Sequence, residues 1–453
     1  MAIESFGSIA KSRRQAKESS IEGLKIDYEE ALNVVKQELS NYMKNDIQEK
    51  IENNDITDNV VKNKEYLYKN KEEKRNLIKE IVYSKNLKVK GYDNKINVLI
   101  EDLLEEIIGF SILADAFNDD EVTDIYCIKW NKIFVERKGK NVKYNKTFKS
   151  PKHYKDFIDR ICQEAGKELN NGDSKKAEFD LYQDRYEATG KTITPEDLTL
   201  TIRKHSEEHI KLEQLIKWEV VTQELADLTG LLINGECNII MAGITGSGKT
   251  TTLRAFIDYF VTENGKRMLV CEDTRELFPK NEHTVELVTS KGNNPVTLRD
   301  LVMIALRLKP KYIVIGEVRG VEAEAAVEGM ATGHSTMFTM HSGTPIDALN
   351  RLVTKYLMQM PSLSIEVVER IIGSAVDYIY IQDDIPGIDR KITSLTEVSY
   401  DYEKRTLALK TIGEFNFETE KFEIINKLSK EKANKMLRRG VPLQEIKKVA
   451  SFK

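Results

Sequence analysis

The sequence predicts an α/β protein in which a domain with a mostly parallel sheet follows a small α+β domain and a charged helical arm. Three observations predict this fold class. Apolar strands alternate with amphipathic helices from Trp218 to about Val398, as in a parallel sheet with crossover helices. A glycine-rich turn of phosphate-binding type follows the first of these strands. Before Trp218, short β-type segments mix with helical patterns.

The composition is that of a globular chain. Its 453 residues are 40% hydrophobic and 31% charged, and domains of about 100–200 residues suggest two to four of them. No apolar run reaches the roughly 18 residues of a membrane span, and the N-terminus has no apolar signal segment, so we expect a cytoplasmic protein. A formal charge of −4 excludes the strongly basic footprint of a general nucleic-acid binder. The four cysteines form no CxxC and the six histidines no HExxH, so neither a disulfide framework nor a zinc site is indicated.

Five segments are predicted along the chain. Residues 1–96 form a charged helical arm, in which glutamates among the lysines favour a solvated helix face over a membrane-binding surface. Residues 97–205 form the small α+β domain, and residues 206–216 form a polar linker. Residues 217–398 carry the parallel sheet, and residues 399–453 form a partly helical tail.

Local patterns predict the elements of the small domain. Apolar clustering, β-type runs and a proline at a helix start indicate them in turn. The expected elements are a helix over Val98–Leu113, strands over Thr123–Lys129 and Lys132–Arg137, a helix after Pro151 and an alternating strand over Leu198–Arg203.

The strongest motif begins at Gly243 and reads GITGSGKT, which fits GxxxxGK[ST] between the strand Asn238–Ala242 and a helix. Glycines let successive backbone N–H groups turn toward phosphates, and the helix N-terminus adds its positive dipole end. Lys249 is expected to reach the β- and γ-phosphates, and Thr250 offers a hydroxyl to Mg²⁺. The strand and helix context argues against an ordinary glycine-rich turn. The predicted nucleotide-binding residues are Gly243, Thr245, Gly246, Ser247, Gly248, Lys249, Thr250 and Thr251.

A cluster of carboxylates follows the next predicted strand, Met268–Cys271. Glu272, Asp273 and Glu276 come at its carboxyl end, where open α/β sheets bind ligands. Such a cluster could hold Mg²⁺ through water, with Glu272 and Asp273 as ligands, and could polarise an attacking water. Each acid taken alone is equally well a surface charge, but their occurrence after a phosphate-binding loop favours function.

A second acid and two histidines follow later strands. Glu317 comes after the strand Tyr312–Ile315 and is a Walker B-like acid, a candidate for both metal binding and catalysis. His341 ends the β-type run that begins at Thr336, where a neutral imidazole could sense the γ-phosphate. His334 closes the preceding helix. A lone histidine is usually structural, but beside the other motifs both histidines become candidate catalytic residues.

These residues resemble the secretion ATPase superfamily of type II and type IV secretion, type IV pili and Tad/Flp pili, and in particular its CpaF/TadA branch. Four boxes of that family are present in its order. They are Walker A (GITGSGKTT), the Asp box (CEDTREL), Walker B (IVIGEVRG) and the His box (TGHSTMFTMHSGT). The resemblance covers about residues 97–400. The chain lacks the tetracysteine insertion of many type II secretion ATPases, which favours the Tad branch, but it has Lys311 where the family often has Asp.

The resemblance implies a homo-hexamer in which an N-terminal α+β domain and a C-terminal RecA-like domain enclose ATP. Arg185 and Arg203 fall where the family places arginines that complete the site, although each could instead be a surface arginine paired with a carboxylate. Glu276 matches the Asp-box glutamate proposed to activate water, and Glu317 matches the Walker B glutamate. Two further arginines match family positions with less defined roles: Arg319 and Arg351.

The main hypothesis is therefore a cytoplasmic Mg²⁺-dependent ATPase at the inner face of the membrane that drives a platform protein of a pilus or secretion system. Lys249, Mg²⁺ and the arginines would stabilise phosphoryl charge, and Glu276, Glu317 or both would orient water. An alternative is a nucleic-acid motor or the DNA-transfer ATPase of a type IV secretion system, although the slightly acidic chain has no clear basic and aromatic strip. A third is a nucleotide-binding scaffold without hydrolysis, against which the intact carboxylates argue.

Overall fold

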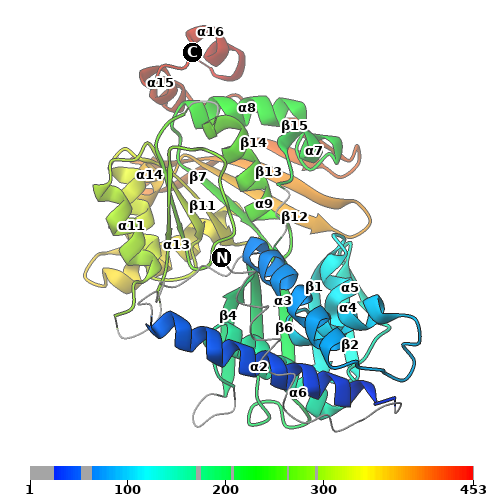
Figure 1. Ribbon diagram of the computed structural model, residues 1–453. Helices are drawn as coiled ribbons and strands as arrows, with labels where there is room; N and C mark the ends of the chain where they lie inside the picture. Colours follow the sequence, from blue (N-terminus) through cyan, green and yellow to red (C-terminus); the bar gives the residue numbers. More distant parts are fainter. Residues whose placement is uncertain are drawn as a thin grey trace. The chain divides into compact units, whose positions relative to one another are not determined.

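The computed structural model describes residues 25–52, 64–169, 175–205, 209–262, 265–290 and 294–451. The chain forms two compact units, Met1–His205 and Ser206–Lys453, which Figure 1 colours along the sequence. Parts of the predicted arm and linker, including residues 1–24, 53–63 and 206–208, lie outside the described residues.

The first unit is built on a six-stranded antiparallel sheet with the order β3-β2-β1-β6-β5-β4. Its strands are β1 (Val122–Lys129), β2 (Lys132–Arg137), β3 (Lys140–Lys143), β4 (Lys176–Leu181), β5 (Asp184–Thr189) and β6 (Thr199–Arg203). Its helices are α2 (Tyr28–Glu52), α3 (Lys64–Ser84), α4 (Ile96–Ile107), the 3₁₀ turn η2 (Ser111–Leu113), α5 (Ala114–Asn118) and α6 (Pro151–Glu164).

The described helices of the predicted arm pack into this unit. Val35 of α2 and Ile78 of α3 are fully buried in the same hydrophobic core as the sheet. The predicted helix after Pro151 is confirmed as α6, because the Ser150 hydroxyl accepts a hydrogen bond from the His153 N–H and Pro151 takes the first turn. The apolar residues at helical spacing in the arm therefore serve the core of the α+β unit.

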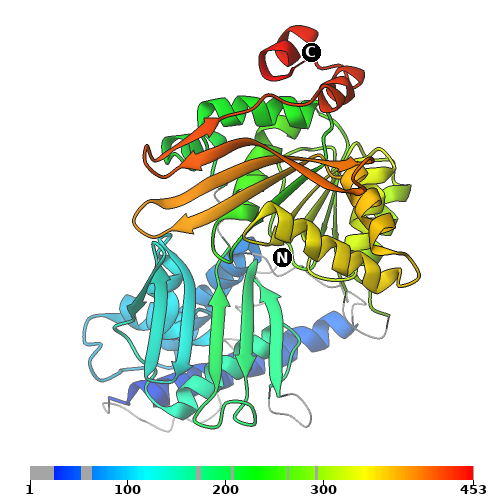
Figure 2. The same cartoon turned by 180° about the vertical axis from the view of Figure 1, so that it is seen from behind.

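The second unit contains a nine-stranded sheet with the order β15-β14-β13-β12-β7-β11-β10-β8-β9. The strands from β12 to β9 in this order run parallel to their neighbours, and β13 to β15 continue the sheet antiparallel. Figure 2 shows this extension in orange and red. The strands are β7 (Ile239–Gly243), β8 (Met268–Glu272), β9 (Thr284–Val288), β10 (Tyr312–Glu317), β11 (Ser335–His341), β12 (Tyr378–Ile385), β13 (Asp389–Asp401), β14 (Thr406–Asn416) and β15 (Lys421–Ile424). The predicted α/β fold class is confirmed.

Helices cover both faces of this sheet. One core joins α7 to α9 and the C-terminal helices to side chains such as Met241, and the other joins α11 to α14 to the alternating side chains such as Ile240. Strands buried on both faces read as continuous apolar runs. The helices are α7 (Leu212–Lys217), α8 (Gln223–Asn234), α9 (Lys249–Phe256) with the π-helical turn η3 (Ile257–Val261), α11 (Leu298–Arg307), α12 (Glu322–Ala331), α13 (Pro345–Gln359), α14 (Ile365–Ala375), α15 (Lys430–Arg438) and α16 (Leu443–Val449).

Two predicted boundaries fall inside elements of this unit. Residue 398 lies within β13, and the sheet continues through β14 and β15. The predicted linker 206–216 overlaps α7, whose Leu212 and Leu215 are buried in the core of the unit. The composition of the linker did not indicate α7, because a polar surface element can still bury a few apolar side chains.

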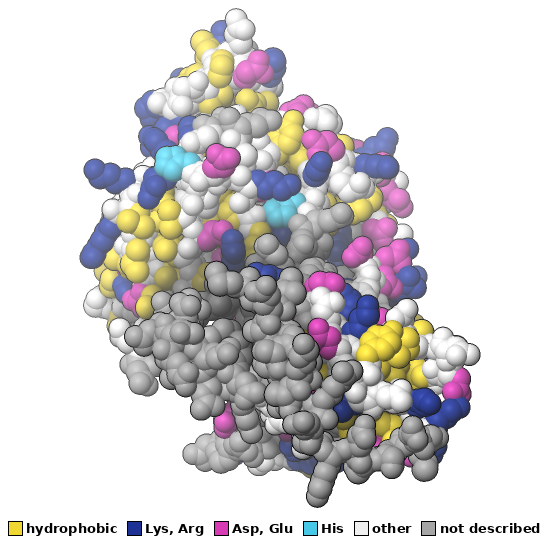
Figure 3. Space-filling view, viewed as in Figure 1, with side chains coloured by type: hydrophobic (Ala, Val, Ile, Leu, Met, Phe, Trp, Pro, Cys, Tyr) yellow, Lys and Arg dark blue, Asp and Glu magenta, His cyan; other side chains and the backbone are white. Residues whose placement is uncertain are grey.

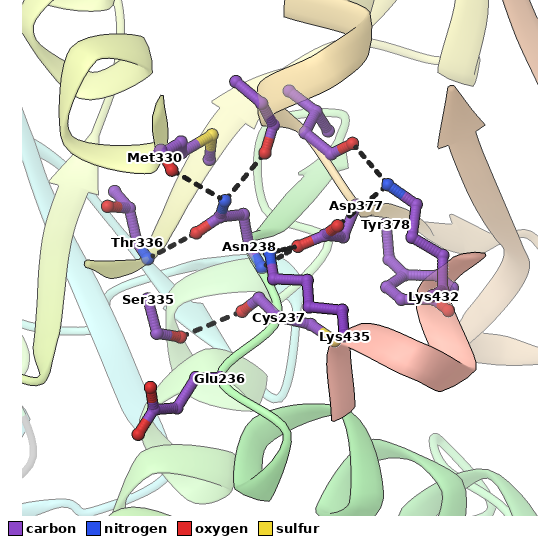
Figure 4. A network of polar contacts seen from close by, with 12 residues as sticks. Glu236, Cys237, Asn238, Met330, Ser335, Thr336, Asp377, Tyr378, Lys432 and Lys435 are labelled. Carbon is purple, nitrogen blue, oxygen red and sulfur yellow. Dashed lines mark hydrogen bonds and ion pairs between the residues drawn. The ribbon is translucent and has the colours of Figure 1, made fainter. Parts of the chain in front are cut away.

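A buried charge cluster attaches α15 to the sheet (Figure 4). The Asp377 carboxylate, at the start of β12, accepts hydrogen bonds from Lys432 Nζ at 2.8 Å and from the Asn238 N–H at 2.7 Å, and it pairs with Lys435. The side chains of Asp377 and Lys432 are only 3% and 4% exposed. Burial opposes ionisation of Asp377, but the two lysines outweigh it and lower its pKa.

The described surface is mixed in character. Figure 3 shows positive and negative side chains interspersed over the face in view. All four cysteines are buried and unpaired. No helix in the described part of the chain is both long and apolar enough to span a membrane.

Candidate nucleotide-binding site

The GITGSGKT motif forms a tight loop between β7 and α9. Gly246 and Gly248 adopt φ values of +81° and +90°, a left-handed region that side chains rarely tolerate. A Cβ on Gly243 would lie 2.0 Å from the Gln382 carbonyl oxygen. Gly248 precedes the first residue of α9, so the loop leads straight into the positive end of that helix. The glycines are therefore required by the geometry of an anion-binding loop.

Lys249 closes the loop. Its Nζ donates a hydrogen bond to the Ile244 carbonyl oxygen at 2.7 Å and lies 3.5 Å from His341 Nδ1. Burial lowers the pKa of the ammonium, while Glu317 acts in the opposite direction. Lys249 is thus held at the mouth of the loop, where an incoming anion would replace a neutral carbonyl as its partner.

The predicted motifs meet at one edge of the sheet. β7, β11, β10 and β8 are consecutive neighbours, and all are parallel. His341 pairs in register with Gly243, and Glu317 and Glu272 end the next two strands. The carboxyl ends of the four strands therefore line up the phosphate-binding loop, a histidine and two acids in that order.

Glu317 lies between two nitrogen-bearing side chains. His341 Nε2 is 2.9 Å from Glu317 Oε1, and Arg319 Nη2 donates to Oε2 at 2.5 Å. Burial opposes ionisation, but the Arg319 hydrogen bond and the charges of Arg319 and Lys249 outweigh it and lower the pKa of Glu317. Oε1 is buried and accepts no well-aligned hydrogen bond from the described residues. Glu317 is therefore an ionised carboxylate with spare capacity to accept.

His341 connects the loop to Glu317. Its Nδ1 lies 3.5 Å from Thr245 Oγ1 as well as from Lys249 Nζ. Burial lowers its pKa below the ordinary value of 6.5, as do Lys249 and Arg319, against the pull of Glu317. The imidazole is therefore neutral at pH 7, with one nitrogen facing the cationic lysine and the other facing the acid.

The acids after β8 divide into different environments. Glu272 is 2% exposed, and its Oε1 accepts the backbone N–H groups of Glu276 and Leu277 at 3.1 Å each. Burial raises the pKa of Glu272 to about 8, so it is protonated at neutral pH. In this state its side chain shapes the following loop, and its role as a Mg²⁺ ligand stays a prediction. Asp273 is exposed, and both Asp273 and Glu276 contribute negative potential at Arg319.

The structure does not bring His334 to the loop. His334 precedes β11, whereas His341 ends it, and at about 3.3 Å per residue the strand separates them by roughly 20 Å. The His334 Nδ1 lies 3.0 Å from the Pro310 carbonyl oxygen. His334 therefore lies near the amino-terminal ends of the strands and does not contact the phosphate-binding loop of its own chain.

Arg185 and Arg203 belong to the first unit. They face each other across β5 and β6. The Arg203 Nε donates to Asp124 Oδ1 at 3.0 Å, and the Arg185 Nε lies 4.0 Å from Asp180 Oδ1. Within this unit both therefore pair with carboxylates, as the alternative interpretation of the sequence expects, while the Arg203 side chain stays 55% exposed.

Sequence analysis missed Gln382. It lies at the carboxyl side of β12, next to the loop, and its Nε2 donates to the Ser247 carbonyl oxygen at 2.7 Å. No motif marks it. The one available signal is its position directly after the apolar run Tyr378–Ile381, where a parallel strand reaches the ligand edge.

The residues present fit a Mg²⁺ ion that phosphates hold in part. The described residues contain no cluster of three or more His, Cys, Asp or Glu side chains able to hold a metal ion. Mg²⁺ at nucleotide sites commonly uses one or two protein oxygens together with phosphates and waters. Two described residues offer such oxygens: Thr250, half-buried in the first turn of α9, and Glu317, at the end of β10.

The chain is similar to several known proteins. A family model described as "Type II/IV secretion system protein" matches residues 190–394. The conjugal transfer protein TrbB of Rhizobium radiobacter is 34% identical over 200 residues, 44% of this chain and 59% of that protein. An uncharacterized protein of Methanocaldococcus jannaschii is 31% identical over 214 residues, which are 46% of this chain and 76% of the length of that protein. The crystal structure of the pilus retraction motor PilT with bound ADP matches 74% of this chain and 87% of its own at 18% identity, with a TM-score of 0.46. The chain spans about half the length of some curated relatives that it matches.

Proposed function

Because the chain belongs to the type II/IV secretion ATPase superfamily, we propose that it hydrolyses ATP with Mg²⁺ to power pilus assembly or secretion. The observation that carries the proposal is the ionised Glu317 on β10, the second strand from the phosphate-binding loop, with the neutral His341 on the strand between them. A loop alone would support binding. An ionised carboxylate beside the loop supports hydrolysis.

In the proposed reaction the loop binds the phosphates, and the acids at the strand ends orient the attacking water. Backbone N–H groups and Lys249 hold the β- and γ-phosphates, and Lys249 exchanges the Ile244 carbonyl for a phosphate oxygen. Bound Mg²⁺ supplies positive charge that offsets charge developing on the transferring phosphoryl group. Thr250 and Glu317 are its proposed protein-side partners, with Asp273 acting at longer range through water. The small number of metal ligands fits a metal that arrives with the nucleotide.

Glu317 or Glu276 orients the attacking water. Glu317 is the stronger candidate because its lowered pKa keeps it ionised. His341 senses the phosphate through Lys249 and Thr245 and relays that contact to Glu317. Arg319, which pairs with Glu317 in this state, can move its guanidinium to phosphate oxygens as negative charge builds up.

In the proposed ring, arginines of the first unit complete the site in the second unit. Family position assigns Arg185 and Arg203 to this task, and their neighbouring strands present two guanidinium groups together. We infer a homo-hexamer that acts on an inner-membrane platform protein from the cytoplasm, as in Tad-like pilus systems, with no direct nucleic-acid contact.

The test measures ATPase rate against protein concentration with light scattering in parallel. Wild type is compared with Lys249→Ala and with Lys311→Ala, a matched control at the opposite edge of the same sheet, where Lys311 pairs with Glu236. The proposal expects the wild-type rate per subunit to rise as a hexamer forms, the control to follow it, and Lys249→Ala to lose turnover. Full activity in Lys249→Ala would contradict the site.

A DNA-transfer ATPase is the second candidate, and the similarity to a conjugal transfer protein favours it. The two candidates share the catalytic site and differ in what couples to it. Single-stranded DNA added to the wild-type assay distinguishes them. Stimulation of the rate at low salt that disappears with added salt would favour DNA transfer, and an unchanged rate favours the pilus or secretion motor.

A further inference from the structure

The end of β12 lies directly beside the phosphate-binding loop. Gln382 pairs with Gly243 in the parallel register of β12 and β7, and the missing Cβ of Gly243 is what lets the two backbones approach. The Gln382 side chain crosses to the other arm of the loop, where Nε2 donates to the Ser247 carbonyl oxygen. With Gln382 1% exposed and Ser247 fully buried, the contact is shielded from competing water.

β12 is irregular at this residue. Its ladder with β13 shifts register between Ile381 and Gln382, and such bulges re-aim side chains beside functional sites. Gln382 Oε1 is buried and accepts no hydrogen bond from the described residues. An unmet buried acceptor lowers stability, so an apolar side chain would serve folding better here. The donor at Nε2 is the feature that an apolar side chain lacks.

Through the geometry of the peptide bond, the Gln382 donor also sets the direction of the Gly248 N–H. In a trans peptide the carbonyl and the following N–H point in opposite directions. Because Gln382 holds the Ser247 carbonyl toward β12, the N–H of Gly248 points away from β12. Gly248 has the left-handed φ of +90° that this arrangement needs. The Gln382 hydrogen bond thus fixes the direction of one of the backbone donors on which an anion-binding loop depends.

We propose that Gln382 is a positioning residue that pre-orients the loop to bind nucleotide phosphates, through the Ser247 carbonyl and the Gly248 N–H. This inference rests on the proposed function and assigns it a residue outside the four motifs. It also ties the loop to the antiparallel extension, since Gln382 belongs to the β12–β13 hairpin. The next residue, Asp383, is close enough to Lys249 to act on its pKa.

The test uses Gln382→Met in the full chain, because methionine keeps the length of the side chain and removes both the donor and the unmet acceptor. Calorimetric titration with MgADP should show affinity weakened about fivefold, as expected for one lost hydrogen bond, while the melting temperature is not lowered. Asp384→Asn, on the same hairpin and about half exposed, is the control and should bind as wild type does.

A second variant, Gln382→Glu, keeps the shape and loses the donor only while it is ionised. Its deficit relative to wild type should shrink at pH 5, where the acid can donate to Ser247. Wild-type affinity in Gln382→Met, or a lowered melting temperature with unchanged affinity, would overturn the positioning role. If wild type itself does not bind MgADP, the proposed function falls and this inference with it, a result distinct from equal binding by both proteins.

Discussion

At the scale of single residues, two glutamates at equivalent strand ends have opposite protonation states. Glu317 is ionised because Arg319 and Lys249 outweigh its burial, whereas Glu272 is protonated at neutral pH because burial outweighs its two backbone hydrogen bonds. Environments that separate the pKa values of neighbouring acids divide their roles. Here one acid is available for chemistry, and the other shapes the loop that carries Glu276.

Glu272→Gln should change how stability depends on pH. The pKa of Glu272 is about 8 in the fold against an ordinary 4.5, so the native state binds the extra proton and wild-type stability falls as pH rises between these values. Glutamine keeps the acceptor and cannot ionise. The unfolding free energy of each protein is measured by urea denaturation. We expect the value for Glu272→Gln minus that for wild type to be about 2 kcal/mol larger at pH 9 than at pH 6. The exposed Glu282→Gln is the control, and equal pH slopes in wild type and Glu272→Gln would refute the buried neutral acid.

His341→Gln should separate binding from turnover. Glutamine can accept and donate without charge but cannot bridge Lys249 and Glu317 at both ends. We expect MgADP affinity within about twofold of wild type and kcat about tenfold lower, the effect of roughly 1.4 kcal/mol in the transition state. Since the imidazole acts in its neutral form, the wild-type rate should decline as pH falls below 6.5, and the variant should lack that part of the decline. A pH profile identical to that of wild type would remove His341 from the mechanism.

At the scale of elements, the antiparallel extension and α15 are part of the second unit. Asp377 joins three elements, since it directly precedes β12, accepts from the N–H of Asn238 just before β7, and pairs with two lysines of α15. Glu236, beside Asn238, pairs with Lys266, Lys311 and Arg439. These ion pairs lie at the edge of the sheet opposite the phosphate-binding loop, so they serve attachment of the C-terminal helices.

Asp377→Asn should destabilise the protein because it leaves the buried Lys432 ammonium without its anion. Breaking one side of a buried pair costs about 3–5 kcal/mol, measurable as a lower urea midpoint. The double variant Asp377→Asn with Lys432→Met removes the stranded charge and should recover at least half of the loss. Equal stability of the single and double variants would mean that the pair contributes through packing alone.

At the scale of the whole molecule, the proposed chemistry is divided between two units that fold around separate cores. The phosphate-binding loop, Glu317 and His341 lie in the second unit, whereas Arg185 and Arg203 lie in the first. Charge on the transferring phosphoryl group needs cations on more than one side. The proposed ring supplies them by bringing an arginine-bearing sheet to a loop-bearing sheet.

Arg203→Ala tests this division. We expect kcat to fall by a factor on the order of 10³, as for arginines that complete other phosphoryl-transfer sites, with MgADP binding and the melting temperature nearly unchanged. Arg137→Ala is the matched control, because Arg137 lies on the same sheet, is 51% exposed and pairs with Asp119 and Glu121. Should both variants keep the wild-type rate, Arg203 would be an ordinary surface arginine.

The sequence by itself determined the fold class and the four motifs, because hydrophobic period and glycine spacing are local properties that the backbone must obey. It placed Gly243, Lys249, Glu317 and His341 in one site through the rule that parallel strands share a carboxyl edge. Only the tertiary structure decided that Glu272 is neutral, that His334 lies at the far edge and that Gln382 supports the loop. Protonation, strand direction and cross-strand contacts depend on neighbours distant in the chain, and no local pattern records them.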